Sequence, residues 1–343
     1  MTEQALSGSA NGAECPPVVS VITIFYNAPV VFFQEAIDSV LAQTETQWEL
    51  LLVDDGSTDQ SSDIARRAVA THPDRMRLLT HPGGSNRGMS ASRNLGIGAA
   101  QGEFVAFLDA DDVYLPEKLE RQIAVLNTHP EVGMVFGPTL HWWSWTGDPA
   151  DRQRDSVRRL GGAPETVVPA PELVRAYLER RADTPATCGV LIRRAAIEDV
   201  GGFDARFPDL YEDQAFFFKL LLVESAYVEG QAWDRYRRHP DAMCEVRIRE
   251  GKHSDDYSVT APRRSFLEWL TAYFRQTAVA DGDLRRLLGR ELWPYRHPWL
   301  QRSGMALRSV VRTAVPRPAR RAARWCLRSL RSRRRAHTSE PTR

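Results

Sequence analysis

Three aspartates that follow a short apolar run are the residues of this sequence best suited to chemistry. Asp109, Asp111 and Asp112 end the stretch FVAFLDADD, in which residues 104–108 have the length and composition of a buried strand. Open α/β sheets bind their ligands beyond the carboxyl ends of strands. Two carboxylates separated by one residue can face one hard cation and leave positions for phosphate oxygens. The pattern predicts a site for a metal and a diphosphate, unless Asp112 only caps the helix that begins near Pro116.

The segments around these aspartates alternate between strand and helix patterns, which predicts βαβ units and an α/β fold. In the helical segment before them, Ala91, Leu95 and Ala99 recur every four residues and predict one helix face. Further segments with a clear pattern are predicted strands at 18–25, 48–53, 76–80, 132–136 and 187–192, and predicted helices at 171–181, 266–274 and 284–292.

Two polar loops follow the second and third predicted strands. The DDGSTD turn (54–59) has two interpretations: it is a well-formed turn and helix cap, or Asp54 and Asp55 offer carboxylates to a ribose or nucleobase. The HPGGSNRG loop (81–88) contains glycines that would let backbone N–H groups approach an anion. Because the ends of parallel strands meet at one sheet edge, both loops are expected near Asp109.

Composition excludes several classes of protein. With 343 residues, 43% hydrophobic and 26% charged, the chain has the composition of an ordinary globular protein. Cys15, Cys188, Cys244 and Cys326 form no CxxC pair, which argues against a zinc ribbon or a disulfide framework and suits a reducing cytoplasm. Residues 1–17 read as a disordered leader without the pattern of a signal peptide, and no run of 18 apolar residues occurs.

Ordered motifs over residues 18–245, about two-thirds of the chain, resemble those of family 2 glycosyltransferases with the GT-A fold. The motifs are SVITIFYN (20–27), LLVDDGSTD (51–59), NRGMSASRNLGI (86–97), FLDADD (107–112), GGFDARF (201–207), YEDQ (211–214) and YRRHPDA (236–242). The resemblance implies a Rossmann-like, mixed, mostly parallel sheet flanked by helices. It also implies a nucleotide-binding half (18–112) and an acceptor half (113–245), followed by a helical extension (246–301) and a basic tail (302–343).

The same resemblance implies roles for individual residues. It gives the donor-binding role to six positions: Tyr26, Asn27, Asp55, Gly88, Arg93 and Asp109. Asp111 would hold a divalent cation, Mg²⁺ or Mn²⁺, and His239 is a candidate further ligand, although a His in a polar loop is more often a surface residue. Asp213 would be the catalytic base, with Glu212 beside it as an orienting group or simply a favourable charge at a helix N-terminus.

The chemistry of sugar transfer independently requires a cation site and a catalytic base. A diphosphate leaving group needs a cation to neutralise its developing charge. A hydroxyl acceptor is a poor nucleophile, so a carboxylate must take its proton as it attacks the anomeric carbon from the opposite face, which inverts the sugar. The sequence departs from the QxxRW motif of processive synthases, because Gln231 and Arg235 are one residue too far apart and Tyr236 follows. Addition of a single sugar is therefore expected.

Three tryptophans and two arginines are further candidates for the site. Trp142, Trp143 and Trp145 precede a charged Gly/Pro-rich loop and are either platforms for sugar rings or packing residues. Arg237 or Arg238 could pair with the diphosphate.

The basic tail also has more than one interpretation. Residues 302–343 contain thirteen arginines and one acid, a net charge of +12 in a chain whose total is +1. Its arginine-rich amphipathic helices are expected to lie on an anionic membrane surface, since lipid-linked acceptors are frequent in the family. Nucleic acid is the competing partner and is not expected, and a solvated tail is the simplest alternative.

The sequence therefore predicts a cytoplasmic glycosyltransferase, peripheral at the inner face of the cell membrane. It would move one sugar from a nucleotide sugar, a UDP-sugar by preference, to a glycan or lipid-linked acceptor in cell-surface polysaccharide assembly. A non-catalytic sugar-nucleotide or glycan-binding protein on the same fold is the alternative.

Overall fold

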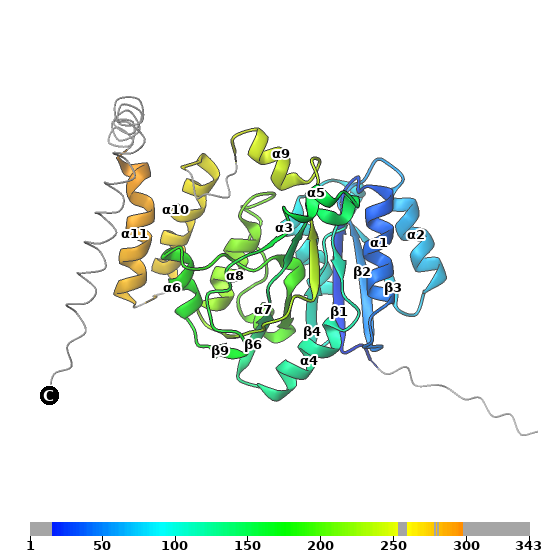
Figure 1. Cartoon of the computed structure of the whole chain (residues 1–343), viewed down its shortest axis with the longest axis horizontal. Coiled ribbons are helices and arrows are strands. Elements are labelled where there is room, and N and C mark those ends of the chain that lie inside the picture. The colour runs from blue at the N-terminus through cyan, green and yellow to red at the C-terminus, as the bar shows by residue number, and fades with distance from the viewer. Residues whose placement is uncertain (1–15, 253–258, 278, 280, 298–343) are drawn as a thin grey trace, which may run out of the picture. The chain divides into compact units, whose positions relative to one another are not determined.

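The computed structural model describes residues 16–252, 259–277, 279 and 281–297, and these form a mixed α/β fold (Figure 1). The strands are β1 Val19–Phe25, β2 Trp48–Asp54, β3 Met76–Thr80, β4 Phe104–Phe107, β5 Val113–Tyr114, β6 Val132–Phe136, β7 Leu140–Trp142, β8 Ser156–Val157, β9 Thr166–Val168, β10 Val190–Arg193, β11 Ser225–Val228 and β12 Asp234–Arg237. The α-helices are α1 Val30–Leu41, α2 Ser61–Thr71, α3 Met89–Ala99, α4 Lys118–Thr128, α5 Pro149–Arg152, α6 Glu172–Leu178, α7 Arg194–Asp199, α8 Glu212–Leu221, α9 Met243–Arg249, α10 Ala261–Gln276 and α11 Gly282–Arg296.

The main sheet has the order β3-β2-β1-β4-β10-β6-β11-β9, and a smaller sheet has the order β5-β12-β7-β8. The first four strands of the main sheet are parallel, and β10 runs antiparallel between β4 and β6. Every residue of β1 and β2 is buried, as expected for strands covered on both faces. The predicted architecture, a mixed and mostly parallel sheet flanked by helices, is confirmed.

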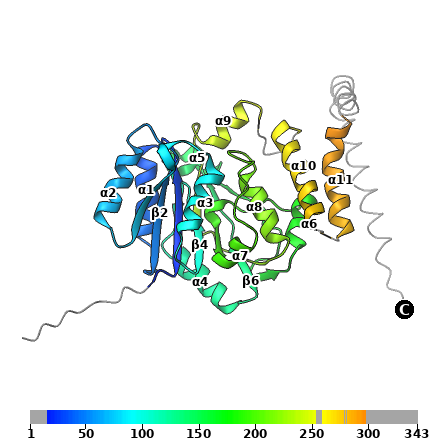
Figure 2. The same cartoon turned by 180° about the vertical axis from the view of Figure 1, so that it is seen from behind.

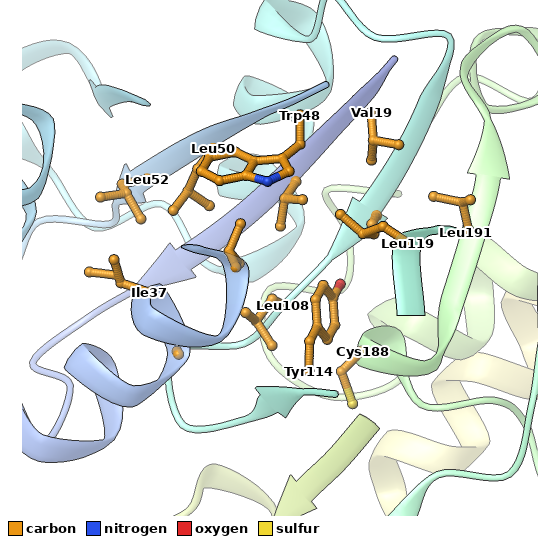
Figure 3. Packing of buried hydrophobic residues seen from close by; sticks show 14 of the residues in the cluster. Val19, Ile37, Trp48, Leu50, Leu52, Leu108, Tyr114, Leu119, Cys188 and Leu191 are labelled. Atoms are coloured by element: carbon orange, nitrogen blue, oxygen red, sulfur yellow. The ribbon is translucent and has the colours of Figure 1, made fainter. Parts of the chain in front are cut away.

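Helices cover both faces of the main sheet (Figures 1 and 2). On one face, Ile37 of α1 belongs to the same buried cluster as Leu50 and Leu52 of β2 (Figure 3). On the other face, the ring of Phe107 at the end of β4 lies 6.2 Å from that of Phe216 in α8. Burial on both sides holds the carboxyl ends of the parallel strands at one edge, where the DDGSTD turn and Asp109 emerge.

Helix α3 buries a polar face, which differs from the sequence-based expectation. The predicted face of Ala91, Leu95 and Ala99 is only half-buried, whereas Ser92 and Arg93 are buried. A polar face can be buried when its groups find partners, and Ser92 Oγ lies 2.9 Å from the Nε2 atom of a buried histidine. Hydrophobic periodicity therefore located this helix but did not identify its inner face.

One predicted strand is replaced in part by a turn. The expected strand at 187–192 begins as the 3₁₀ turn Thr187–Gly189, and β10 starts only at Val190. A Cβ atom on Gly189 would lie 2.7 Å from Thr139 Oγ1, so the turn approaches the neighbouring chain closely. The turn places Thr187 at the end of β4, where its hydroxyl donates to Asp109.

The chain divides into two compact units, residues 1–288 and 289–343, so that α9 and α10 belong to the unit that holds the sheet. Most of the predicted leader and all of the predicted basic tail (302–343) lie outside the described residues. Within the described part of the chain, no helix has the length and apolarity needed to span a bilayer. The predicted boundaries at 112 and 245 stay predictions.

Two glycines of α3 provide a test of how tightly this helix packs on the sheet. A Cβ on Gly96 would lie 2.4 Å from Ile22 Cγ2, whereas a Cβ on Gly98 would meet nothing within 4 Å. Gly96→Ala is expected to lower the free energy of unfolding by ~1–3 kcal/mol through overpacking. Gly98→Ala is expected to raise it by ~0.5–1 kcal/mol through helix propensity. Urea unfolding measures both, and equal effects would contradict the packing described.

Candidate active site

One cavity of about 650 Å³ lies at the carboxyl ends of β1 and β4. The residues predicted for the site all line it: Tyr26, Asn27, Asp55, Gly88, Arg93, Asp109, Asp111, Glu212, Asp213 and His239. They come from segments more than 200 residues apart in the sequence. The tertiary structure thus brings the whole predicted set to one place, while the role of each member stays a prediction.

Asp55 organises the loop that precedes α3. Its two carboxylate oxygens accept hydrogen bonds from the backbone N–H groups of Arg87, at 2.7 Å, and Gly88, at 3.0 Å. Gly88 has a φ of 84°, and a Cβ there would lie 2.8 Å from the carbonyl oxygen of Pro208. The sequence predicted that backbone N–H groups of this loop would approach an anion. The N–H groups of Arg87 and Gly88 instead bind the Asp55 carboxylate of the same chain.

The DDGSTD turn uses its two aspartates differently. Asp54 holds the turn itself, because its carboxylate accepts from Ser57 N at 2.7 Å and from the Ser62 hydroxyl. Asn27 joins this turn to the end of β1: its backbone N–H donates to Ser57 Oγ, and its side-chain oxygen accepts from Thr58 N at 2.8 Å. Asn27 adopts a φ of 47°, in the left-handed region that asparagine enters more readily than most residues other than glycine.

Arg93 connects the aspartate segment to helix α8. Its guanidinium is 2% exposed and forms two ion pairs of 2.8 Å, with Asp109 Oδ1 and with Glu212 Oε1. Burial alone would lower the pKa of the guanidinium, but the charges of Asp109 and Glu212 outweigh that effect and raise it. A buried cation needs such partners, so Arg93 holds both carboxylates at fixed positions.

Glu212 and Asp213 begin α8 and lie in different environments. Glu212 is buried, and burial together with the charge of Asp213 raises its pKa to about 8, although Arg93 acts in the opposite direction. Asp213 is partly exposed to the cavity, and its Oδ1 atom accepts from the N–H of Gln214. The preceding Tyr211 has a φ of 67°, which turns the chain sharply into the helix. Both carboxylates line the cavity, and Asp213 is the more exposed of the two.

The aspartates that follow β4 separate into three environments. Asp109 pairs with Arg93, and Asp111 Oδ2 lies 3.1 Å from Nε2 of His239. Asp112 is buried and accepts from the backbone N–H of Arg237, so it does not cap α4. Burial, reinforced by the neighbouring aspartates, raises the pKa of Asp112 well above its usual range.

Asp111 and His239 are the residues best placed for a divalent cation. No group of three or more His, Cys, Asp or Glu side chains in the described ranges is arranged to hold a metal. Mg²⁺ is commonly held by one or two protein ligands together with the phosphates of a substrate. Carboxylate oxygens suit Mn²⁺ as well as Mg²⁺. A carboxylate and an imidazole within hydrogen-bonding distance, beside a cavity, therefore fit a cation shared with a diphosphate.

Arg237 determines the position of Asp111, a role that sequence analysis did not foresee. Its Nε atom donates to the carbonyl oxygen of Asp111 at 2.8 Å, and its Nη2 atom pairs with Glu35. Its guanidinium carbon lies 4.3 Å from the ring centre of Phe32 and 4.6 Å from that of Trp142. Such a cation enclosed by aromatic faces is stabilised beyond its hydrogen bonds.

Two sequence-based alternatives are resolved by these contacts. Neither Arg237 nor Arg238 lines the cavity, so the diphosphate-pairing interpretation is not supported. Trp142, Trp143 and Trp145 do not line it either, and all three pack against Arg237 or Arg238. They are packing residues and not platforms for a sugar at this cavity.

Sequence motifs did not point to the far wall of the cavity. That wall includes Arg247 of α9, and Phe266 and Leu267 of α10. The helical periodicity of 266–274 was visible in the sequence, but nothing in it indicated that this helix reaches the site.

Comparison with known proteins shows to which family this chain belongs. A model of glycosyl transferase family 2 matches residues 20–201, more than half of the chain. The chain belongs to glycosyl transferase family 2. Among curated relatives, the uncharacterized glycosyltransferase alr2836 of Nostoc sp. is 43% identical over 117 residues, or 34% of this chain and 35% of that protein. EpsE of Bacillus subtilis, named as a glycosyltransferase, is 39% identical over 119 residues, or 35% of this chain and 42% of EpsE. The chain spans less than half the length of these relatives.

Solved structures share the family's GT-A fold. The mannosyltransferase PcManGT from Pyrobaculum calidifontis, solved with GDP-Man and Mn²⁺, has a TM-score of 0.57 at 21% identity and covers 92% of this chain and 81% of its own. TarS 1–349 of S. aureus, solved with UDP-GlcNAc, has a TM-score of 0.51 at 22% identity and covers 75% of this chain and 72% of its own. At these identities the likeness establishes the fold.

Arg237→Lys tests the contribution of the enclosed guanidinium. Lysine keeps the charge, but it cannot donate to Asp111 and Glu35 at the same time or stack on the rings. The free energy of unfolding is therefore expected to fall by ~2 kcal/mol. Arg235 lies on the same strand, 5.0 Å from the centre of the Trp142 ring, and is less buried. Arg235→Lys is therefore the control, with an expected change within ~0.5 kcal/mol in urea unfolding. Equal losses would contradict the special role of Arg237.

Proposed function

We propose that the protein is a metal-dependent, inverting glycosyltransferase that moves a single sugar from a nucleotide sugar to a hydroxyl of a glycan or lipid-linked acceptor. The observation that carries this proposal is that Asp213 and the Asp109–Asp111 segment line one cavity and are linked through Arg93 and Glu212. One cavity is thus lined both by a carboxylate that could accept a proton and by carboxylates that could bind a diphosphate through a cation.

The donor half of the cavity supports a nucleotide sugar. Tyr26, Asn27 and Asp55 surround the end of β1, where open α/β sheets bind nucleotides. TarS has been solved with UDP and with UDP-GlcNAc, and PcManGT with GDP-Man. We take a UDP-sugar as the first donor to test and a GDP-sugar as the second.

A divalent cation is part of this proposal. Asp111 and His239 would hold Mg²⁺ or Mn²⁺, and PcManGT has been solved with Mn²⁺. When bound, the ion supplies positive charge against the diphosphate as that group leaves. Arg237 and Asp112 keep the chain around Asp111 in place, since the Arg237 N–H donates to Asp112 Oδ1 at 2.9 Å.

Asp213 would act as the base for the acceptor. The acceptor oxygen forms a bond to the anomeric carbon while its proton passes to the Asp213 carboxylate. The bond from the anomeric carbon to the diphosphate breaks, and its electron pair stays on the diphosphate oxygen. Attack from the face opposite the leaving group inverts the configuration of the sugar.

Cell-surface polysaccharide assembly is the proposed setting. One relative, TuaG of Bacillus subtilis, is named for teichuronic acid biosynthesis and is 39% identical over 107 residues, or 31% of this chain and 41% of TuaG. Among the described residues, the thiols of Cys188 and Cys244 are free, which is compatible with the reducing cytoplasm. Contact of residues 302–343 with an anionic membrane belongs to the same proposal.

Nucleotide release from a panel of UDP- and GDP-sugars, with Mn²⁺ or Mg²⁺ and then with a chelator, tests this function. We expect one donor to be consumed only when the metal is present. Asp111→Ala and Asp213→Asn are each expected to lower the rate by at least ~100-fold, because each removes a group needed in the transition state. Asp199→Asn, at the exposed end of α7, is the matched control and should keep full activity.

The outcomes separate the enzyme from the alternative binding protein. A donor that binds with the same affinity to the native chain and to Asp213→Asn, without turnover in the presence of sugar acceptors, would support a non-catalytic binding protein. Full activity of Asp213→Asn would remove Asp213 from the role of base.

Glu212→Gln distinguishes a positioning role of Glu212 from a catalytic one. Glutamine has the same shape and can accept a hydrogen bond from Arg93, so a positioning role predicts a loss of only ~10-fold, smaller than that of Asp213→Asn. The variant also removes a carboxyl group whose pKa is about 8. If the rate changes with pH near 8 because Glu212 titrates, that change should be absent in the variant. A loss as large as that of Asp213→Asn, with an otherwise unchanged pH profile, would contradict this assignment.

A further inference from the structure

Part of the cavity has an apolar lining. We name as the apolar recess the side chains of Tyr177, Leu178, Tyr211, Phe218, Phe266 and Leu267, which all line the cavity. None is more than 6% exposed. Apart from Tyr211, which precedes α8, they belong to α6, α8 and α10, which lie side by side in both views (Figures 1 and 2).

The recess follows helix α8 inward from the proposed base. Tyr211, Gln214 and Phe218 are spaced by three and four residues, so one face of α8 borders the cavity. From Gln214 to Phe218 the helix rises by ~6 Å. Exposure falls along this path, because Asp213 and Gln214 are partly exposed while Phe218 is buried.

Ring packing holds the walls of the recess in place. Phe266 stacks on Tyr211, with ring centres 5.3 Å apart, and meets Phe218 edge-on at 5.4 Å. The ring of Tyr177 lies 5.9 Å from that of Phe218. The Tyr211 hydroxyl bonds with side chains of the α10 segment, Thr260 and Arg263, so its polar end is satisfied away from the ring face.

The cavity wall is polar near Asp213. Asp209, Gln214, Asp241 and Arg247 also line it, and Arg247 Nη2 lies 2.6 Å from Asp209 Oδ2. Sugar hydroxyls can find hydrogen-bond partners among these side chains. Against Phe218 and Phe266 they would lose their bonds to water without replacement, so that part of the cavity favours an apolar group.

We infer that the acceptor is amphipathic: a hydroxyl-bearing group, such as a sugar, reacts at Asp213 and is joined to an apolar alkyl or aryl group that occupies the apolar recess. This inference rests on the proposed function, because it takes Asp213 as the reaction centre. Phe266 and Leu267 lie outside the segment that the family model matches, so the inference does not rest on the family motif alone.

Glycosides that differ only in their aglycone test the inference without any donor. Binding of methyl, phenyl and n-octyl β-D-glucopyranoside to the full chain is measured by titration calorimetry, with the octyl compound below its micelle concentration. The octyl or the phenyl glycoside is expected to bind at least ~10-fold more tightly than the methyl glycoside, through burial of apolar area. A gain for the octyl compound indicates a chain-bearing acceptor, and a gain for the phenyl compound alone indicates an aryl acceptor.

Two leucines of α10 form a matched pair of variants. Leu267 lines the recess and is 1% exposed, whereas Leu270 is 0% exposed and does not line the cavity. Leu267→Ala is expected to weaken binding of the preferred glycoside by ~5-fold or more, while Leu270→Ala leaves it unchanged. Both variants are checked by thermal unfolding, and Leu178→Ala replaces Leu267→Ala if the latter does not fold.

Equal affinity for all three glycosides would overturn the inference, as would tighter binding that both leucine variants leave intact. Neither result would touch the proposed function, which donor turnover tests separately. Conversely, the protein could bind the preferred glycoside selectively through Leu267 and yet turn over no donor. That result would support the apolar recess as a binding site and contradict the proposed enzymatic function.

Discussion

The ion pairs of Arg93 are the interaction on which the rest of the site depends. Its guanidinium lies in the protein interior between Asp109 and Glu212, at 2.8 Å from each. A buried cation is tolerated only with such partners, so the three groups must be placed together as the chain folds. They belong to α3, to the segment after β4 and to α8. One side chain thus links the donor half to the acceptor half.

Two non-glycine residues with positive φ angles line the same cavity. Asn27, at the end of β1, and Tyr211, before α8, both adopt positive φ angles without being glycine. Such conformations persist where surrounding contacts determine them, and they cluster at functional sites. Asn27 is held by its bonds to Ser57 and Thr58, and Tyr211 by stacking on Phe266. Two of the four non-glycine positions with positive φ among the described residues therefore lie at the cavity, while Glu165 and Arg180 do not line it.

The smaller sheet supplies the remaining constraint. Strand β12 pairs with β5, directly after the aspartates, and with β7, which carries Trp142. This pairing returns Arg237 and His239 to Asp111 across more than 120 residues of sequence. Trp142 and Trp145 then pack on Arg237, which accounts for two aromatic residues that do not line the active-site cavity. The Arg237 guanidinium, packed against aromatic rings, thus holds the backbone of Asp111, which with His239 forms the pair suited to a metal.

The sequence by itself determined the family, the α/β architecture and the set of polar residues at the site, because strand periodicity and motif order are local patterns. It located α3 but not its buried face, since Ser92 and Arg93 are buried through partners that only folding provides. It identified Glu212 and Asp213 as neighbours, while their different environments follow from Arg93, more than 100 residues earlier. It gave no sign that Phe266 and Leu267 reach the cavity, because the packing of α10 against α8 depends on contacts between distant segments and not on any local pattern.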